Sequence, residues 1–183
     1  MNTKRFFLLL PTLLMPYIAI ASLFIIFFST KNQLANYIME SVFKSNALLL
    51  LALFAITVIL SVILACICSF ISIKNAWDPL AFSKTIMIIK LIQIPAFIII
   101  FILSLAFMLT IFTLPFAIAL FFLDILSLLS TGFLNIAAII TASKNGEVNF
   151  KDNLWLAVLQ FIFCADVIAS IIFYLKLKKK QNK

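Results

Sequence analysis

Residues 91–141 read LIQIPAFIIIFILSLAFMLTIFTLPFAIALFFLDILSLLSTGFLNIAAIIT, and this stretch decides the fold class of the chain. It contains no Lys, Arg, Glu or His, and Asp124 is its single charged residue. The core of a soluble domain of 183 residues is interrupted by polar surface turns far more often than this. One bilayer crossing takes about 20 apolar residues, so the stretch is long enough for two crossings. The sequence therefore predicts an integral membrane protein.

The composition of the whole chain supports this interpretation. Hydrophobic residues make up 66% of the sequence and charged residues 11%, whereas soluble chains contain about 45–50% and about 25%. Helices satisfy their own backbone groups in lipid, and no ten-residue alternation of apolar and polar residues that would indicate a barrel recurs. We expect an all-α, multi-pass transmembrane helical bundle that forms one domain over residues 1–183, without a soluble lobe.

Five apolar segments of the chain are long enough to cross a membrane. They cover about residues 6–30, 47–73, 91–114, 116–141 and 154–175. Pro11 and Pro16 should bend the first segment, because each proline removes a backbone donor. Residues 31–46 carry apolar side chains at helical spacing, which predicts a short amphipathic helix on the membrane surface.

Two dipeptides mark the expected ends of helices. Asp78-Pro79 is typical of a helix start, with an aspartate at the N-cap and proline in the first helical position. Asn145-Gly146 is a turn signal that follows the fourth apolar segment. Lys84 and Lys90 precede the third segment, so we expect their side chains to extend toward the membrane surface.

The basic residues do not favour five crossings. With the N-terminus inside, five spans distribute the Lys and Arg residues equally between the two sides, whereas cytoplasmic loops normally carry the excess. Four crossings would gather more of them on one side, but one apolar segment would then have to be re-entrant or interfacial. We expect five spans on hydropathy and keep four plus a re-entrant or interfacial segment as the alternative.

Basic residues gather at both ends of the chain. Lys4 and Arg5 precede the first span, and a tail of residues 176–183 follows the last one. The lysines of this tail are Lys176, Lys178, Lys179, Lys180 and Lys183. We expect them to contact anionic lipid headgroups of the bacterial cytoplasmic membrane. Nothing in the chain, such as interleaved aromatic residues, supports nucleic-acid binding.

Two carboxylates, Asp124 and Asp166, lie inside the predicted spans. A charge within the bilayer is costly, so such residues are functional candidates by default. Polar or small residues follow each of them at spacings of three and four. These are Ser127, Thr131, Asn135 and Ala138 on the fourth segment, and Ala169 and Ser170 on the fifth. Hydrogen bonding between helices, a proton or cation site, and docking to a charged helix of a partner are the three interpretations.

The loop between the fourth and fifth segments allows the depths of these residues to be compared. Asn135 and Gln160 lie at similar depths, roughly 10 Å from the loop. In an antiparallel pair they could therefore form a hydrogen bond. On one ideal helix, Gln160 and Asp166 point about 120° apart, so a single interface does not easily hold both. The predicted spans contain no Lys, Arg or His to pair with either carboxylate.

The residues required for most catalytic and metal sites are missing. The chain has no His, and therefore no Ser-His or Cys-His pair. Its two glycines cannot form a phosphate-binding loop. Cys66 and Cys68 would lie about 200° apart around a helix, too far to hold one metal ion together. We expect no metal, no cofactor and no enzymatic activity.

The last third of the chain resembles a known group of proteins. The segments STG (130–132), KNG (144–146) and QFIFCADVIAS (160–170) carry the similarity. They resemble the C-terminal part of small multi-pass membrane proteins of low-GC bacteria, an uncharacterised family. This resemblance implies a membrane protein of four or five helices and brings no activity or ligand with it.

Two functions fit these observations. The first is a non-enzymatic membrane protein that acts through helix contacts with another membrane protein or with itself, such as an accessory subunit or a self-protection protein. The alternative is a small oligomeric transporter or channel for protons or a small solute. It would use Asp124 and Asp166 together with the stripe of Thr131 and Asn135.

Overall fold

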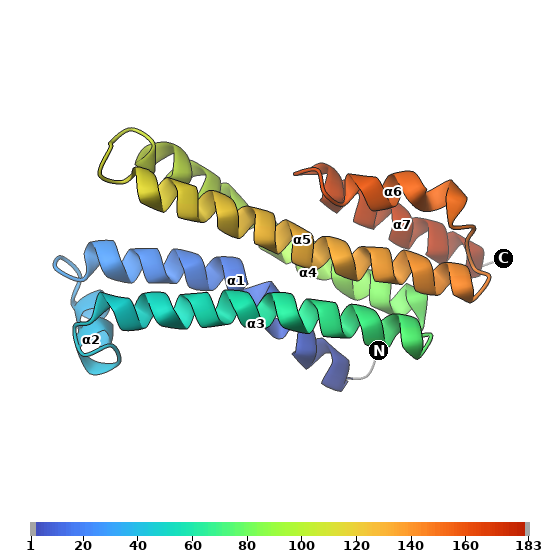
Figure 1. Ribbon diagram of the computed structural model, residues 1–183, viewed down its shortest axis with the longest axis horizontal. Helices are drawn as coiled ribbons and strands as arrows, with labels where there is room; N and C mark the ends of the chain where they lie inside the picture. Colours follow the sequence, from blue (N-terminus) through green and yellow to red (C-terminus); the bar gives the residue numbers. More distant parts are fainter. Residues whose placement is uncertain (1–2, 182–183) are drawn as a thin grey trace.

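The computed structural model describes residues 3–181, and this part of the chain folds into seven α-helices and one short 3-10 helix, η1 (Figure 1). In chain order they are α1 (Thr3–Phe28), α2 (Gln33–Ser41), α3 (Ala47–Lys74), α4 (Pro79–Phe107), α5 (Leu114–Lys144), η1 (Lys151–Asn153), α6 (Leu154–Leu159) and α7 (Ala165–Gln181). The all-α prediction is confirmed. The tail residues 182–183 lie outside the described residues.

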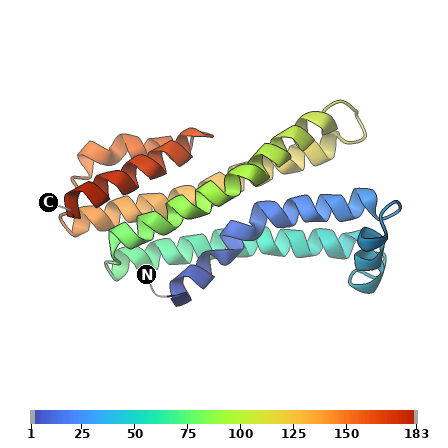
Figure 2. The ribbon, with the colours of Figure 1, turned by 180° about the vertical axis from the view of Figure 1, so that it is seen from behind.

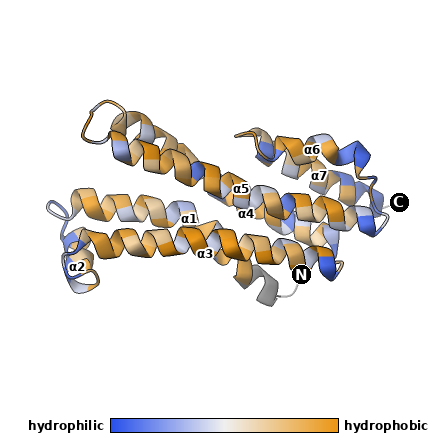
Figure 3. Cartoon of the chain, in the orientation of Figure 1, coloured by the Kyte–Doolittle hydropathy of each residue, from blue (hydrophilic) through white to orange (hydrophobic). Residues whose placement is uncertain are grey.

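Four of the described helices are long and apolar enough to cross a membrane. These segments are Leu8–Phe28, Ala47–Lys74, Pro79–Phe107 and Leu114–Lys144. At 1.5 Å per residue, α3 with its 28 residues is about 42 Å long, more than the roughly 30 Å of a bilayer's hydrocarbon core. Hydrophobic residues cover the long helices, and hydrophilic residues gather mainly toward the two ends of the bundle (Figure 3).

The long helices lie side by side along one axis of the molecule. α3 packs against α1 and α5, and α4 packs against α5, α1 and α7. The beginning of α1 and the end of α7 both lie toward the end of the bundle where α3 leads into α4 (Figures 1 and 2). The opposite end carries α2 and the connection between α4 and α5.

The predicted fifth span, residues 154–175, is not one helix. It consists of α6, a turn over residues 160–164, and the first part of α7. The chain reverses direction in this turn, where Cys164 has a positive φ of 66°. α6 and α7 therefore form a hairpin whose tip lies against α4 and α5 in the middle part of the bundle (Figures 1 and 2). The structure does not confirm five spans.

The two prolines of α1 lie inside the helix, and its N-terminal half is visibly bent (Figure 2). Because Pro16 has no N–H, the carbonyl of Thr12 loses its normal partner within the helix. The buried side chain of Gln93 on α4 replaces that partner, since its Nε2 donates to the Thr12 carbonyl oxygen over 2.7 Å. The bend is thereby fixed to the neighbouring helix. The sequence predicted the bend, but it did not identify Gln93.

The predicted helix-end signals are confirmed. The Asp78 carboxylate accepts hydrogen bonds from the backbone N–H groups of Leu80 and Ala81, and Pro79 is the first residue of α4. At the end of α5, Gly146 has a φ of 72°, and the Glu147 N–H donates to the Ala142 carbonyl. This is the left-handed glycine cap that commonly ends a helix.

The segment predicted as a short amphipathic helix contains α2. Asn32 caps it by accepting hydrogen bonds from Leu34 and Ala35 N–H groups. Met39 on α2 packs with Phe43 and Leu50 in a small cluster between α2, α1 and α3. The face of α2 that carries Ala35 and Met39 therefore contacts the bundle, whereas Leu34, Tyr37 and Val42 of the same segment are exposed.

Candidate functional site

A buried ion pair joins α4 to the hairpin. Lys90 is 2% exposed, and its Nζ lies 2.8 Å from Oδ2 of Asp166. The same ammonium group donates to Gln160 Oε1 over 2.6 Å and reaches the Asp166 carbonyl at 3.4 Å. An ammonium group has three donors. These three acceptors therefore use all of them.

This pair corrects two predictions. The Lys90 side chain is buried inside the bundle and does not extend outward, and a cation is present to pair with Asp166. The physical reason is the position of the helix start. α4 begins at Pro79, so Lys90 lies about 16 Å along a helix that can cross the membrane. Hydropathy alone predicts a span that begins only at residue 91.

The turn of the hairpin explains how Gln160 and Asp166 share one partner. On a continuous helix their side chains would diverge by about 120°. In the structure Gln160 follows the last residue of α6, and Asp166 lies in the first turn of α7, with the turn between them. Both side chains can therefore point at Lys90. The turn allows Gln160 and Asp166 to reach Lys90, and their contacts with Lys90 in turn stabilise the turn.

Ser170 extends this polar cluster to α5. Nδ2 of Asn135 donates to the Ser170 hydroxyl, which in turn donates to the Asp166 carbonyl over 2.7 Å. The Ser170 hydroxyl also lies 3.4 Å from Gln160 Oε1. Asn135 and Gln160 are thus brought together, as their depths suggested, but Ser170 joins them. All of these side chains are buried.

Thr131 and Asp124, the other two candidate residues of α5, form no hydrogen bond with the cluster of described residues around Lys90. Thr131 is buried, and its hydroxyl donates to the Ser127 carbonyl one turn earlier in the same helix, over 3.1 Å. Asp124 is half-buried, and its Oδ1 has no hydrogen-bond partner among the described residues. Asp124 is therefore not part of the Lys90 cluster.

A cavity of about 410 Å³ brings the three charged residues together. It lies between α4, α5 and the tip of the hairpin. Its lining consists of Lys90, Ile94, Phe97, Ile98, Phe101, Asp124, Leu128, Thr131, Phe163, Cys164, Asp166 and Val167. Most of this surface is apolar, so the few polar groups would decide which ligand can enter.

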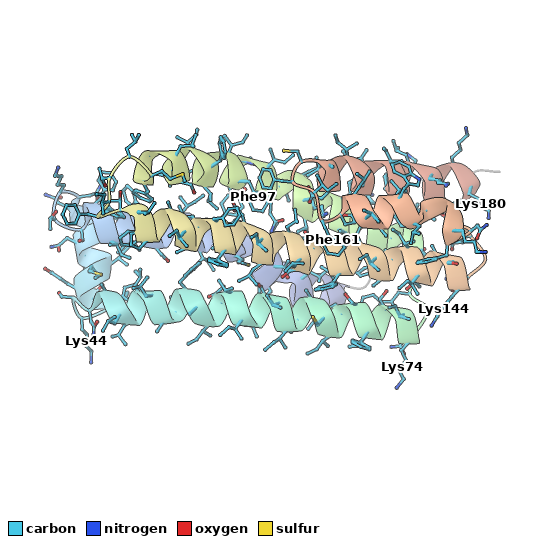
Figure 4. The ribbon with its side chains drawn as sticks, turned by 45° about the horizontal axis from the view of Figure 1, so that its top comes forward. Lys44, Lys74, Phe97, Lys144, Phe161 and Lys180 are labelled. Carbon is cyan, nitrogen blue, oxygen red and sulfur yellow. The ribbon has the colours of Figure 1, made fainter. Side chains whose placement is uncertain are left out.

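Aromatic pairs fix the tip of the hairpin beside the cavity. Phe163 packs edge-to-face on Phe97 of α4, with ring centroids 6.0 Å apart. Phe161 packs in the same way on Phe133 of α5, at 6.2 Å. Figure 4 labels Phe97 and Phe161, which lie near the turn of the hairpin. The tip is therefore held by aromatic contacts on both α4 and α5 and by the ion pair between Lys90 of α4 and Asp166.

The described residues do not form a metal site. No group of three His, Cys, Asp or Glu side chains gathers anywhere in residues 3–181. All three cysteines are free, and Cys164 is the exposed one. The chemistry available in the cavity is thus that of charge and apolar contact.

The basic tail residues lie at one end of the bundle. Lys176 donates to Asn153 Oδ1 over 2.8 Å, and Lys180 donates to the Gly146 carbonyl over 3.1 Å. Lys178 and Lys179 are exposed. Figure 4 shows Lys74, Lys144 and Lys180 at this end and Lys44 at the other. Lys4 and Arg5 lie in the first turns of α1.

A second hollow, of about 440 Å³, lies among these lysines. Lys176, Lys179 and Lys180 line it together with Asp152 and Glu147. Burial raises the pKa of the Glu147 carboxyl, and nearby Asp78 raises it further, while Lys180 acts in the opposite direction. The raised pKa weakens the negative charge of Glu147, so the three lysines outweigh the acidic groups of this hollow.

These features define a class of helical protein. Four described helices are long and apolar enough to cross a membrane, and a helical hairpin is attached to α4 by a buried ion pair and to α5 by a hydrogen bond and an aromatic contact. The sequence matches a family of unknown function (DUF6652) over residues 9–180, and the chain belongs to this family. No curated protein and no solved structure matches it. Membership agrees with the resemblance to an uncharacterised family and leaves the function to be argued from the site.

Proposed function

We propose that this protein is a small membrane transporter or channel whose solute binds in the cavity at the tip of the hairpin. One observation carries the proposal. Lys90, Asp124 and Asp166 line a single cavity between helices that can cross a membrane. Ionisable residues at such depth are expensive and mark solute or ion pathways. Transporters also place their solute sites where membrane helices are interrupted, as the 154–175 segment is.

A matching topology completes the proposal. Four crossings with a re-entrant α6–α7 hairpin put both termini on one side of the membrane. Nearly all basic residues then share that side, because Lys31 and Lys44 alone lie in the connections at the other end. The positive-inside rule assigns the side rich in lysine to the cytoplasm. The exposed Lys178 and Lys179 would contact anionic headgroups there.

The test uses Cys164, which is exposed and lines the cavity. A variant with Cys66→Ala and Cys68→Ala leaves it as the single thiol. Vesicles of both orientations are treated with a membrane-impermeant maleimide. If the cavity is part of a transport pathway, Cys164 should react with the reagent in vesicles of either orientation. Labelling from one side only, or from neither, would contradict transport.

A lipid-facing thiol provides the matched control. Ile59, near the middle of α3, is 58% exposed. Ile59→Cys in a background without the three native cysteines should not react with the aqueous reagent from either side. This variant separates access through a hydrated cavity from general leakiness of the vesicles.

Action through helix contacts is the second candidate, and α3 supports it. Of the four helices that could cross a membrane, α3 has the smallest buried share, and large apolar side chains are exposed along its length. This candidate requires a partner membrane protein that co-purifies with the chain and is lost when Ile56 and Ile63 of α3 are changed to alanine. The transporter proposal requires no such partner.

A further inference from the structure

The charges of the cavity are not balanced. Lys90 is fully engaged, since its ammonium donates to Gln160 and twice to Asp166. An anionic ligand would therefore find no free donor on the one cation of the lining. The opposite holds for Asp124, which lines the cavity and whose Oδ1 accepts no hydrogen bond from any described residue. The group left to attract a ligand is a carboxylate.

The walls of the cavity favour the same kind of ligand. Phe97, Phe101 and Phe163 present aromatic rings, and the faces of such rings attract cations that have lost their water. The other lining residues are mostly aliphatic and would contact an apolar body. The volume of about 410 Å³ lies within the range of roughly 300–1,000 Å³ that is typical of small-molecule sites.

We propose that this cavity binds a lipophilic organic cation, with the positive charge beside Asp124 and the apolar body among the phenylalanine rings. This inference rests on the proposed function in that it names the class of solute. It assigns separate roles to the two aspartates. Asp166 holds the hairpin through Lys90, whereas Asp124 provides the counter-charge for the ligand.

Two probes of the same shape and opposite charge test the inference. Tetraphenylphosphonium and tetraphenylborate are measured by equilibrium binding to the purified full chain in lipid nanodiscs, with empty nanodiscs subtracted. We expect saturable binding of the phosphonium at one site per chain. We also expect the phosphonium to slow maleimide labelling of Cys164 in the variant that retains only this thiol. The borate should do neither.

Asp124→Asn keeps the shape of the side chain and removes its charge. We expect at least a tenfold loss of phosphonium affinity, while Asp152→Asn, a carboxylate away from the cavity, should leave affinity unchanged. Equal binding of the two probes would overturn the inference, as would unchanged affinity in Asp124→Asn. If Asp124→Asn does not fold, the comparison of the two probes on the unmodified chain decides whether the cavity prefers a cation.

The binding experiment and the labelling test of the proposed function can fail independently of each other. Access to Cys164 from both sides without phosphonium binding would overturn the cationic class and leave transport standing. Phosphonium binding with access from one side only would support the site and overturn transport.

Discussion

Lys90 holds three parts of the chain together through one nitrogen atom. Its ammonium group joins α4 to the end of α6 and to the first turn of α7. In water such a pair contributes little. Here the lysine side chain is 1% exposed and the aspartate side chain 11% exposed, so each charge depends on the other. Removing one partner leaves an uncompensated charge, which is costly in a medium of low dielectric constant.

This dependence predicts the behaviour of substitutions at the pair. Lys90→Met should lower the free energy of unfolding by about 3 kcal/mol, because Asp166 is left buried without a cation. Combining it with Asp166→Leu should restore much of the loss, since neither charge of the pair remains. Unfolding is followed by titration with a denaturing detergent in mixed micelles.

Lys84 supplies the control for this comparison. It lies on the same helix as Lys90, but it is exposed. Lys84→Met should change the free energy of unfolding by a few tenths of a kcal/mol, as is usual for surface sites. If Lys90→Met were no more damaging than Lys84→Met, the ion pair would have no structural role.

At the scale of the helix, α1 shows how a proline bend can be stabilised from outside. Pro16 deprives the Thr12 carbonyl of a backbone partner, and Gln93 of α4 supplies a side-chain donor instead. Tyr17 makes a similar connection, because its hydroxyl donates to the Ile92 carbonyl on α4. The bent part of α1 is thus fixed to α4 by two hydrogen bonds.

A double-mutant cycle tests the role of Gln93. Gln93→Leu should cost about 1–3 kcal/mol, because the buried Thr12 carbonyl is left without a donor. With Pro16→Ala the backbone N–H at position 16 can bond to that carbonyl, so Gln93→Leu should cost clearly less in this background. Equal costs in both backgrounds would show that Gln93 does not act through the Thr12 carbonyl.

Helix ends were predictable from the sequence, because they depend on local chemistry. Asp78-Pro79 and Asn145-Gly146 each mark an end that the structure confirms. The same Asp78 signal contained the information needed to place Lys90, since it starts α4 well before residue 91. The length of the apolar stretch alone places the start of the span at residue 91 and so predicts a surface position for Lys90, whereas the cap at Asp78 places Lys90 well inside α4.

The interruption of residues 154–175 was not predictable in the same way. Its composition is as apolar as that of a membrane span, and no glycine or proline lies in the turn at 160–164. Tertiary contacts hold the turn in place. Lys90 attracts both Gln160 and Asp166, and aromatic rings of α4 and α5 hold Phe163 and Phe161. Single-sequence periodicity carries no information about such partners from distant segments.

At the scale of the whole molecule, the hairpin resolves the conflict between hydropathy and charge. A fifth crossing would carry the lysines of α7 to the side of α2, away from Lys74 and Lys144. A hairpin returns them to the end where Lys74, Lys144 and Lys180 lie together (Figure 4). The loop at the opposite end, residues 108–113, has no charged residue. Its exposed side chains, such as Phe112, are strongly apolar.

The arrangement predicts that both termini face the cytoplasm. Reporter fusions should show this directly, with green fluorescent protein fluorescent and alkaline phosphatase inactive at either end. In a background without the native cysteines, Leu109→Cys should react with an impermeant maleimide added to intact cells, whereas Asn149→Cys should react only after permeabilisation. Both positions are exposed in the structure, so a difference reports sidedness and not burial. An active phosphatase at the C-terminus with an inactive one at the N-terminus would require an odd number of crossings, and residues 154–175 would then have to cross the membrane after all.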